Sequence, residues 1–208
     1  MRYLFFLFLL SLATCQGNLP EGPTGLPILG NHDIHPDTGD TTFHAIPDFA
    51  FYNQDSLLVS NNTFAERIYV ADFFFTSCPS ICPKVKKNML RLYDKHKTHP
   101  EFALVSYTID PKRDSVGKLK QYATNLDITE KDKWHFLTGE KATIYDLAED
   151  YMSIAVEDEN APGGFDHSGW ILLIDKNRHI RSFCDGTDAD AVTKFMDDID
   201  WLLANNGK

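Results

Sequence analysis

Two cysteines separated by three residues carry the most evident chemistry in the chain. They stand in the segment Cys78-Pro79-Ser80-Ile81-Cys82-Pro83. On helical geometry, positions four apart lie about one turn from each other, so both sulfurs can face one point. Such a pair can bind a soft metal ion, exchange disulfides with another thiol, or form a structural bridge. The pair alone leaves these three possibilities open.

The residues that flank the pair predict a strand before it and a helix after it. Residues 68–75 are β-branched, aromatic and almost all apolar, as a strand buried on both faces should be. Pro83 suits the first turn of a helix, and apolar residues follow it at helical spacing. We therefore expect Cys82 at or next to the helix N-cap and Cys78 in the preceding turn. Free N–H groups and the helix dipole stabilise a thiolate at such a place.

The rest of the chain predicts a sheet covered by helices. We expect a hairpin over 46–59, strands at 102–109, 134–138, 169–175 and 180–184, and helices at 115–125, 141–151 and 188–204. Residues 152–156 are expected to be extended, and 161–164 to form a loop. This alternation predicts an α/β, thioredoxin-like fold with an N-terminal β-hairpin and a C-terminal helix. In such sheets the site lies at the carboxyl ends of the strands, where the cysteine pair is expected.

His167 is the candidate third ligand of a metal site. It lies in the segment 163–169, directly before the strand that begins near Trp170. In a thioredoxin-like sheet, that loop faces the cysteine turn. Two thiolates and one imidazole form a soft donor set that suits copper, especially Cu(I). Cys78, Cys82 and His167 are therefore the predicted metal ligands, and the two thiols are the predicted redox groups if the protein carries out redox chemistry.

Length and charge limit the function further. The chain has 208 residues and a formal net charge of −10, which predicts one domain with an N-terminal extension. Affinity for phosphate backbones needs clustered Lys and Arg, so we expect no nucleic-acid partner.

The N-terminus has the features of an export signal. Arg2 precedes an apolar run that is too short to span a membrane but has the length of a signal-peptide core. Leu12-Ala13-Thr14-Cys15 resembles a lipoprotein cleavage site, which predicts a signal peptide at 1–14 and a lipid anchor on Cys15. An ordinary signal with an incidental Cys15 is the alternative. We divide the remainder into a flexible tether at 15–43, rich in Gly, Pro, Asn and Asp, and a domain at 44–208.

Several other polar residues have less certain roles. Cys184 leaves an odd cysteine count in the exported domain, which favours a free functional thiol over a disulfide framework. It is either a core residue of the last hairpin or a third thiol near the site. His32, His35 and His44 belong to a solvated linker or, alternatively, to a metal-capturing tract. Asp72, inside the predicted central strand, needs a partner that the sequence does not name. We interpret the remaining histidines as structural: His96, His99, His135 and His179.

Three segments together give the chain a family resemblance. Cys78-Pro79-Ser80-Ile81-Cys82-Pro83 is similar to the Cys-Pro-x-x-Cys-Pro motif of the Sco/SenC family. Asp110-Pro111-Lys112-Arg113-Asp114-Ser115 resembles the Asp-Pro-x-Arg-Asp-Thr/Ser turn of that family, and Asp166-His167-Ser168 resembles its Asp-His-Ser/Thr segment. The resemblance covers about 46–203, with the motifs in the family's order.

The resemblance implies a function for the predicted site. It implies a thioredoxin-like domain that binds one copper through Cys78, Cys82 and His167. It also implies that the protein helps to mature the dinuclear copper centre of cytochrome c oxidase, as a metallochaperone, a thiol reductant or both. The implied partners are the copper-bearing oxidase subunit, thiol reductant proteins and the membrane that holds the lipid anchor, with the domain facing the periplasm.

Two other functions remain open at this stage. A thiol-disulfide oxidoreductase or peroxidase of the same fold would cycle Cys78 and Cys82. A non-catalytic lipoprotein would use the two cysteines as a structural bridge.

Overall fold

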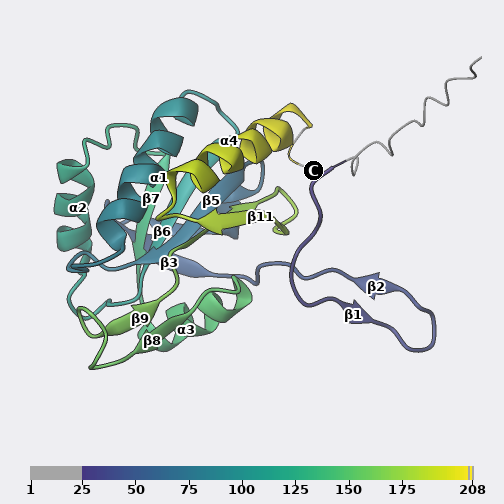
Figure 1. The fold of residues 1–208 in the computed structure, drawn as a ribbon, viewed down its shortest axis with the longest axis horizontal. Coiled ribbons are helices and arrows are strands. Elements are labelled where there is room, and N and C mark those ends of the chain that lie inside the picture. The colour runs from purple at the N-terminus through teal and green to yellow at the C-terminus, as the bar shows by residue number, and fades with distance from the viewer. Residues whose placement is uncertain (1–24, 206, 208) are drawn as a thin grey trace, which may run out of the picture.

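A computed structural model of the chain describes residues 25–205 and residue 207, and its elements follow the predicted order (Figure 1). The main sheet consists of β3 (Ala50–Asn53), β4 (Leu58–Ser60), β5 (Ile68–Phe74), β6 (Phe102–Thr108), β7 (Trp134–Thr138), β10 (Trp170–Ile174) and β11 (Ile180–Asp185). The helices are α1 (Cys82–His96), α2 (Val116–Asn125), α3 (Lys141–Asp150), α4 (Ala189–Ala204) and the short 3-10 helix η1 (Asn61–Phe64). Two small ribbons pair β1 (Asp33–Ile34) with β2 (Thr41–Thr42), and β8 (Ala155–Glu157) with β9 (Phe165–His167).

The main sheet has the strand order β11-β10-β5-β6-β7-β3-β4. Its centre is parallel, because β6 pairs with both β5 and β7 in the same direction. The β10–β11 hairpin adds antiparallel to β5 on one side, and the β3–β4 hairpin adds antiparallel to β7 on the other. This is the predicted thioredoxin-like arrangement, with the N-terminal hairpin at one edge and the C-terminal helix packed on the sheet.

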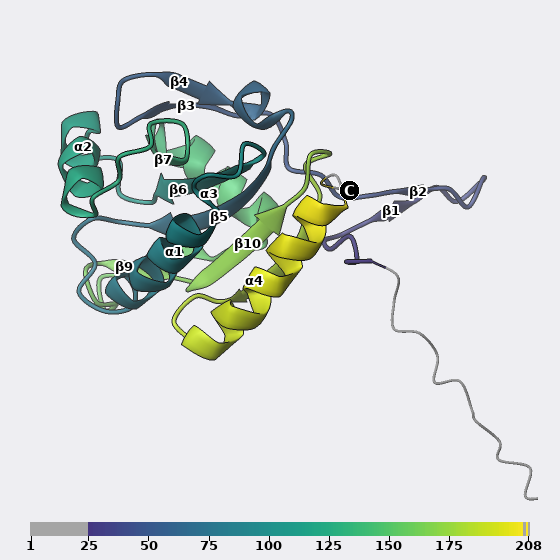
Figure 2. The same cartoon turned by 90° about the horizontal axis from the view of Figure 1, so that it is seen from above.

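Helices cover both faces of the sheet. Figures 1 and 2 show α1 and α4 side by side on one face and α3 on the other. Every residue of β5 and β6 is buried, as expected for strands that helices cover on both sides. The sheet therefore holds the start of α1 in a fixed place at the carboxyl end of β5.

Helix α1 begins as the sequence predicts. Ile81 is its N-cap, Cys82 is its first residue, and Pro83 stands in the first turn, where the missing N–H leaves no bond unmade. The buried side of the helix includes Val85, Met89 and Leu92, at the spacing of a single helical face. The other cysteine lies in the turn between β5 and α1.

Part of the segment that we assigned to a tether lies against the domain. The guanidinium of Arg181 donates to the carbonyls of Leu26 and Pro27, at 2.6 and 3.1 Å, and Leu29 pairs with Ile180. The β1–β2 ribbon follows and projects away from the body in Figure 1. Residues 26–29 therefore belong to the domain surface.

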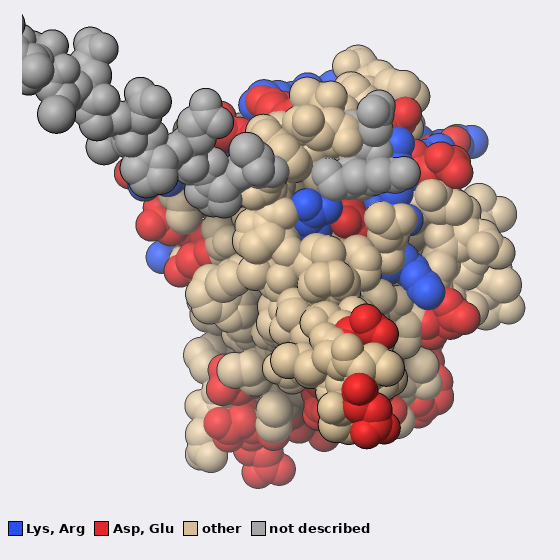
Figure 3. Space-filling view, turned by 90° about the vertical axis from the view of Figure 1, so that its right-hand side faces the viewer, with Lys and Arg blue, Asp and Glu red and all other residues tan. Residues whose placement is uncertain are grey.

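Charge is unevenly distributed over the described part of the chain. Figure 3 shows acidic side chains in both the upper and the lower part of the face that it presents, whereas Lys and Arg gather in the upper part. Among the residues that the structure describes, no helix has the length and apolar character that crossing a membrane requires.

Candidate metal centre

Three side chains meet at the carboxyl end of β5. Nε2 of His167 lies 3.7 Å from Sγ of Cys78 and 3.5 Å from Sγ of Cys82. The three ligand atoms lie within 4.8 Å of one another, and all three residues are buried. Over the described part of the chain, this is the only cluster of three or more Cys, His, Asp or Glu whose ligand atoms converge in this way. The sequence predicted these three residues, and the structure brings them together.

Hydrogen bonds fix the turn that carries Cys78. The carboxylate of Asp114 accepts the backbone N–H of Thr76 at 2.9 Å and the Thr76 hydroxyl at 2.5 Å. It also accepts the hydroxyl of Thr108 at 2.6 Å, so it joins the ends of β5 and β6. Ser115 is the N-cap of α2 and accepts the N–H of Lys118. Asp114 therefore supports the cysteine turn directly and does not cap a helix.

His167 is held by a short ribbon outside the main sheet. We expected this histidine in a loop, but it ends strand β9 and pairs with Ala155 of β8. The ring of Phe75 packs edge-on against its imidazole, with 5.5 Å between ring centroids. The alternation of buried Phe165, exposed Asp166 and buried His167 is the sequence signal that could have revealed the strand.

The turn between β8 and β9 is fastened to the cysteine side of the site. Gly163 has a positive φ of +85°, and a Cβ there would come within 2.8 Å of the Phe75 ring. Arg113 donates to the Gly163 carbonyl at 3.2 Å, forms an ion pair with Asp110, and lies 5.5 Å from the centroid of the Phe165 ring. The Asp-Pro-x-Arg-Asp segment thus supports both the cysteine turn and the histidine ribbon.

The two thiols have unequal acidity. The Cys82 thiol donates to Cys78 and is the largest cause of its lowered pKa, although burial acts in the opposite direction. Together with the His167 side chain and the backbone N–H groups of Cys82 and Ser80, it lowers the pKa of Cys78 to about 3. Donation to Cys78, together with burial, raises the pKa of Cys82. The pair therefore carries its negative charge on Cys78, where the first N–H of α1 contributes to stabilising it.

The donor set fits a soft, low-coordinate metal ion. A first-row ion forms bonds of about 2.3 Å to sulfur and about 2.0 Å to nitrogen, which at trigonal angles place these donors about 3.7 Å apart. The observed separations of 3.5 and 3.7 Å match this value without any movement of the ribbon. Both thiols are free, and Nδ1 of His167 has no hydrogen-bond partner among the described residues. Thiolate and imidazole donors favour Cu(I) and zinc over hard cations.

The other candidate ligands of the sequence lie elsewhere. Cys184, on β11 opposite Ile171, is half-buried, and burial raises the pKa of its thiol to about 12. It is outside the cluster, although it packs against the core. The His32 ring accepts the N–H of His44 at 3.2 Å, and the His44 ring contacts the Asp150 carbonyl at 2.7 Å. These contacts anchor the segment and do not build a metal site; Cys15 lies outside the described residues.

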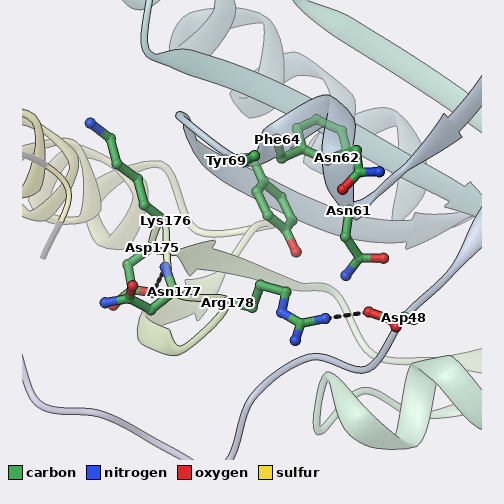
Figure 4. A pocket seen from close by; sticks show the side chains of 10 residues that line it. Asp48, Asn61, Asn62, Phe64, Tyr69, Asp175, Lys176, Asn177 and Arg178 are labelled. Atoms are coloured by element: carbon green, nitrogen blue, oxygen red, sulfur yellow. Dashed lines mark hydrogen bonds and ion pairs between the residues drawn. The ribbon is translucent and has the colours of Figure 1, made fainter.

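Two hollows differ in their relation to this site. A cavity of about 370 Å³ lies beside both sulfurs, and its lining is mainly apolar and also includes Lys86 and Tyr122. A polar pocket of about 310 Å³ lies toward the opposite end of β5, near Tyr69 (Figure 4). Its Arg178 forms an ion pair with Asp48 at 2.6 Å, and no cysteine lines it. Of these two hollows, only the first adjoins the cysteine pair.

The sequence matches known proteins over most of its length. The family model described as SCO1/SenC matches residues 37–204. A SCO1 protein homolog of Bacillus subtilis is 32% identical over 137 residues, which are 65% of this chain and 60% of the relative. A SCO2-like protein of Rickettsia typhi is 29% identical over 154 residues, which are 71% of this chain and 74% of the relative.

Solved structures give the same result. A SCO1/SenC family lipoprotein from Bacillus anthracis superimposes with a TM-score of 0.70 and 26% identity, over 76% of this chain and 95% of that one. BsSco, described as a member of the Sco family of cytochrome c oxidase assembly proteins with a disulfide switch, superimposes with a TM-score of 0.66 and 26% identity, over 76% of this chain and 92% of that one. Arabidopsis thaliana ScoI with copper bound superimposes with a TM-score of 0.62 and 25% identity, over 76% of this chain and 99% of that one. The chain belongs to the SCO1/SenC family.

Proposed function

We propose that this protein binds one copper ion through Cys78, Cys82 and His167 and takes part in assembling the dinuclear copper centre of cytochrome c oxidase. The convergence of two buried sulfurs and one imidazole nitrogen carries the proposal. Copper is the cargo here, and the soft donor set favours it as Cu(I). Two relatives support the proposal, since one is described as copper-bound and another as an oxidase assembly protein.

The residues around the ligands have defined tasks in this function. Asp114 holds the cysteine turn, and Arg113 holds the ribbon that carries His167. The cavity beside the sulfurs gives a donor or acceptor protein a path to the cysteine pair. The copper-bearing subunit of the oxidase is the proposed acceptor, and thiol reductant proteins are the proposed electron donors.

A copper titration of the reduced, full-length protein in detergent tests this function. We expect one Cu(I) per chain against a competing chelator, and we expect His167→Ala to weaken binding by at least tenfold because one of the three donors is lost. His35→Ala, which removes an exposed imidazole of the β1–β2 ribbon, is the matched control and should bind as the wild type does. Stoichiometric binding that is unaffected by His167→Ala would refute the assignment.

The acidity of Cys78 also favours a role as a thiol reductant. A thiolate at neutral pH can attack an oxidised cysteine pair, and Cys82 can then resolve the mixed disulfide. The test is transfer of electrons from the reduced protein to a peptide that contains an oxidised cysteine pair. Copper transfer without disulfide reduction would limit the protein to delivery.

We further propose that the protein is exported and anchored to the membrane by a lipid on Cys15. The solved Bacillus anthracis relative is described as a lipoprotein, and the sequence before Cys15 resembles a lipoprotein cleavage site. Mass spectrometry of the mature N-terminus tests this proposal. An unmodified N-terminus at another residue would contradict it.

A further inference from the structure

A buried ion pair lies directly behind the cysteine pair. Lys86, one helical turn after Cys82, donates through Nζ to the carboxylate of Asp72 at 2.7 Å and to the hydroxyl of Ser106 at 2.8 Å. The side chains of Lys86 and Asp72 are 3% and 2% exposed. Asp72 is the carboxylate of β5 for which the sequence named no partner. An ammonium group thus lies inside the protein, near a site built to hold negative charge.

The surroundings fix this ammonium in place. Nζ lies 4.2 Å from the centroid of the Phe74 ring and also faces the rings of Trp134 and Phe136, at 5.3 and 5.5 Å. Ser106 donates to Asp72 and accepts the indole N–H of Trp134 at 2.9 Å. Burial lowers the pKa of Lys86, and Asp72 opposes this effect. Aromatic faces, a hydroxyl and a carboxylate are all favourable to a cation.

Stability alone does not account for such a pair. The free energy of removing two charges from water is about as large as the free energy of their attraction. Replacing a buried ion pair with apolar residues of similar volume therefore often leaves stability unchanged or raises it. The network is nevertheless directional. Lys86 lines the cavity that also contains Cys78 and Cys82, whereas Asp72 does not. Lys86, and not Asp72, is therefore the member of the pair next to the sulfurs, and its charge acts on Cys82.

We propose that Lys86 is a positioning residue for charge: held by Asp72 and Ser106, its ammonium stabilises negative charge on the Cys78–Cys82 sulfur pair. This favours the reduced pair over the disulfide and, in the part that rests on the proposed function, favours bound Cu(I) over Cu(II). Coulomb attraction between groups shielded from water is strong enough to act over one helical turn.

The charge balance gives the direction of each effect. Two glutathione thiols reduce the disulfide, since they supply two electrons and two protons and leave as glutathione disulfide. One proton stays on Cys82 and the other passes to the buffer, so the reduced pair carries one negative charge, which a nearby cation stabilises. Two thiolates, a neutral imidazole and Cu(I) carry one net negative charge, whereas the same ligands with Cu(II) are neutral. The cation therefore stabilises the Cu(I) form more than the Cu(II) form.

The test is equilibration of the full-length protein with glutathione redox buffers at pH 6, followed by alkylation and mass spectrometry. In Lys86→Met/Asp72→Asn, which removes both charges, we expect the equilibrium constant for reduction to fall by at least tenfold, or about 30 mV for a two-electron couple. In Lys86→Arg, which keeps a side chain that stays positively charged when buried, we expect the constant to stay within threefold of the wild type. Lys95→Met/Asp200→Asn, an exposed pair at the far end of α1, is the matched control and should not change it.

The outcomes separate charge from packing. A double variant within twofold of the wild type would overturn the inference. A fall in Lys86→Arg equal to that in the double variant would also overturn it, because the cause would then be altered packing and not the lost positive charge. If Lys86→Met/Asp72→Asn does not fold by circular dichroism, Lys86→Gln/Asp72→Asn takes its place with the same expectation.

The glutathione measurement needs no copper, so it can fail or succeed independently of the proposed function. A second measurement compares Cu(I) and Cu(II) affinities in the same variants. We expect the double variant to lose at least tenfold in Cu(I) affinity relative to Cu(II). Wild-type protein that binds no copper would refute the proposed function and leave the thiol result standing.

Discussion

Protonation of His135 should destabilise the protein as the pH falls. This imidazole lies on β7, where its Nδ1 accepts from the amide of Asn53 at 3.2 Å and its Nε2 has no partner among the described residues. Burial lowers the pKa of His135 from 6.5 to about 4. Between pH 4 and pH 6.5, His135 therefore binds a proton in the unfolded chain but not in the folded protein. Stability contributed by the neutral ring is complete above pH 6.5 and is lost as the pH falls toward 4.

The size of the effect follows from the gap in pKa. One pKa unit corresponds to about 1.4 kcal/mol, so the gap is worth about 2 kcal/mol by pH 5 and about 3 kcal/mol by pH 4. Urea unfolding of the reduced, copper-free protein at several pH values measures it. His135→Gln cannot take up the proton, so its free energy of unfolding should fall less than that of the wild type by these amounts.

The control is His35→Gln, because His35 is exposed on the β1–β2 ribbon and should leave the pH dependence unchanged. Parallel pH profiles for the wild type and His135→Gln would refute the reasoning. That result would mean that the folded protein accommodates the imidazolium, for example by rotating the Asn53 amide.

Two further predictions concern the support of the metal centre. Asp114→Asn should lower the free energy of unfolding by about 2 kcal/mol, because the amide cannot accept all three of the observed hydrogen bonds. It should also weaken Cu(I) binding, and unchanged urea unfolding would contradict the supporting role. Gly163→Ala should cost about 1–3 kcal/mol more than Gly39→Ala in the same assay. Both glycines have positive φ, but only a Cβ at Gly163 meets the Phe75 ring, so equal costs would contradict this contact.

The cysteine half of the site was predictable because its signals are local. An apolar strand, a proline in the first turn and a helical apolar pattern place Cys78 and Cys82 within one short segment. The assignment of the thiolate was less direct. The helix N-terminus acts on Cys78, through backbone N–H groups that point at it from the turn, and Cys82 serves as a donor.

The histidine half depended on long-range structure. Strands β8 and β9 have three residues each. Residues 165–167 alternate, but Ile154 and Val156 on the facing segment are exposed, so the sequence does not reveal that the two strands pair. Tertiary contacts of Phe75 and Arg113 with this ribbon bring His167 to the cysteines. The family motifs indicated that the three ligands meet, but they did not reveal this route.

The partner of Asp72 was also missed, although a signal existed. Lys86 stands between Val85 and Met89, on the side of α1 that the apolar pattern assigns to the core. A lysine on a buried helix face and an aspartate in a buried strand each need an opposite charge, so the two could have been paired from the sequence. The contacts of residues 26–29 had a weaker signal, since only Leu26 and Leu29 pack against the core.

The ribbon that carries His167 gives the metal centre a mechanical role. Cys82 and His167 are 85 positions apart in the chain, so an ion shared between them closes a long loop, as a covalent crosslink does. Because the three ligands converge only in the folded chain, the protein with a bound ion should resist unfolding more than the ion-free protein. Loss of the proposed ion would remove this closure, while Arg113 and Phe75 would still hold the ribbon beside the cysteine turn. Delivery of the ion would therefore lower the carrier's resistance to unfolding without displacing His167.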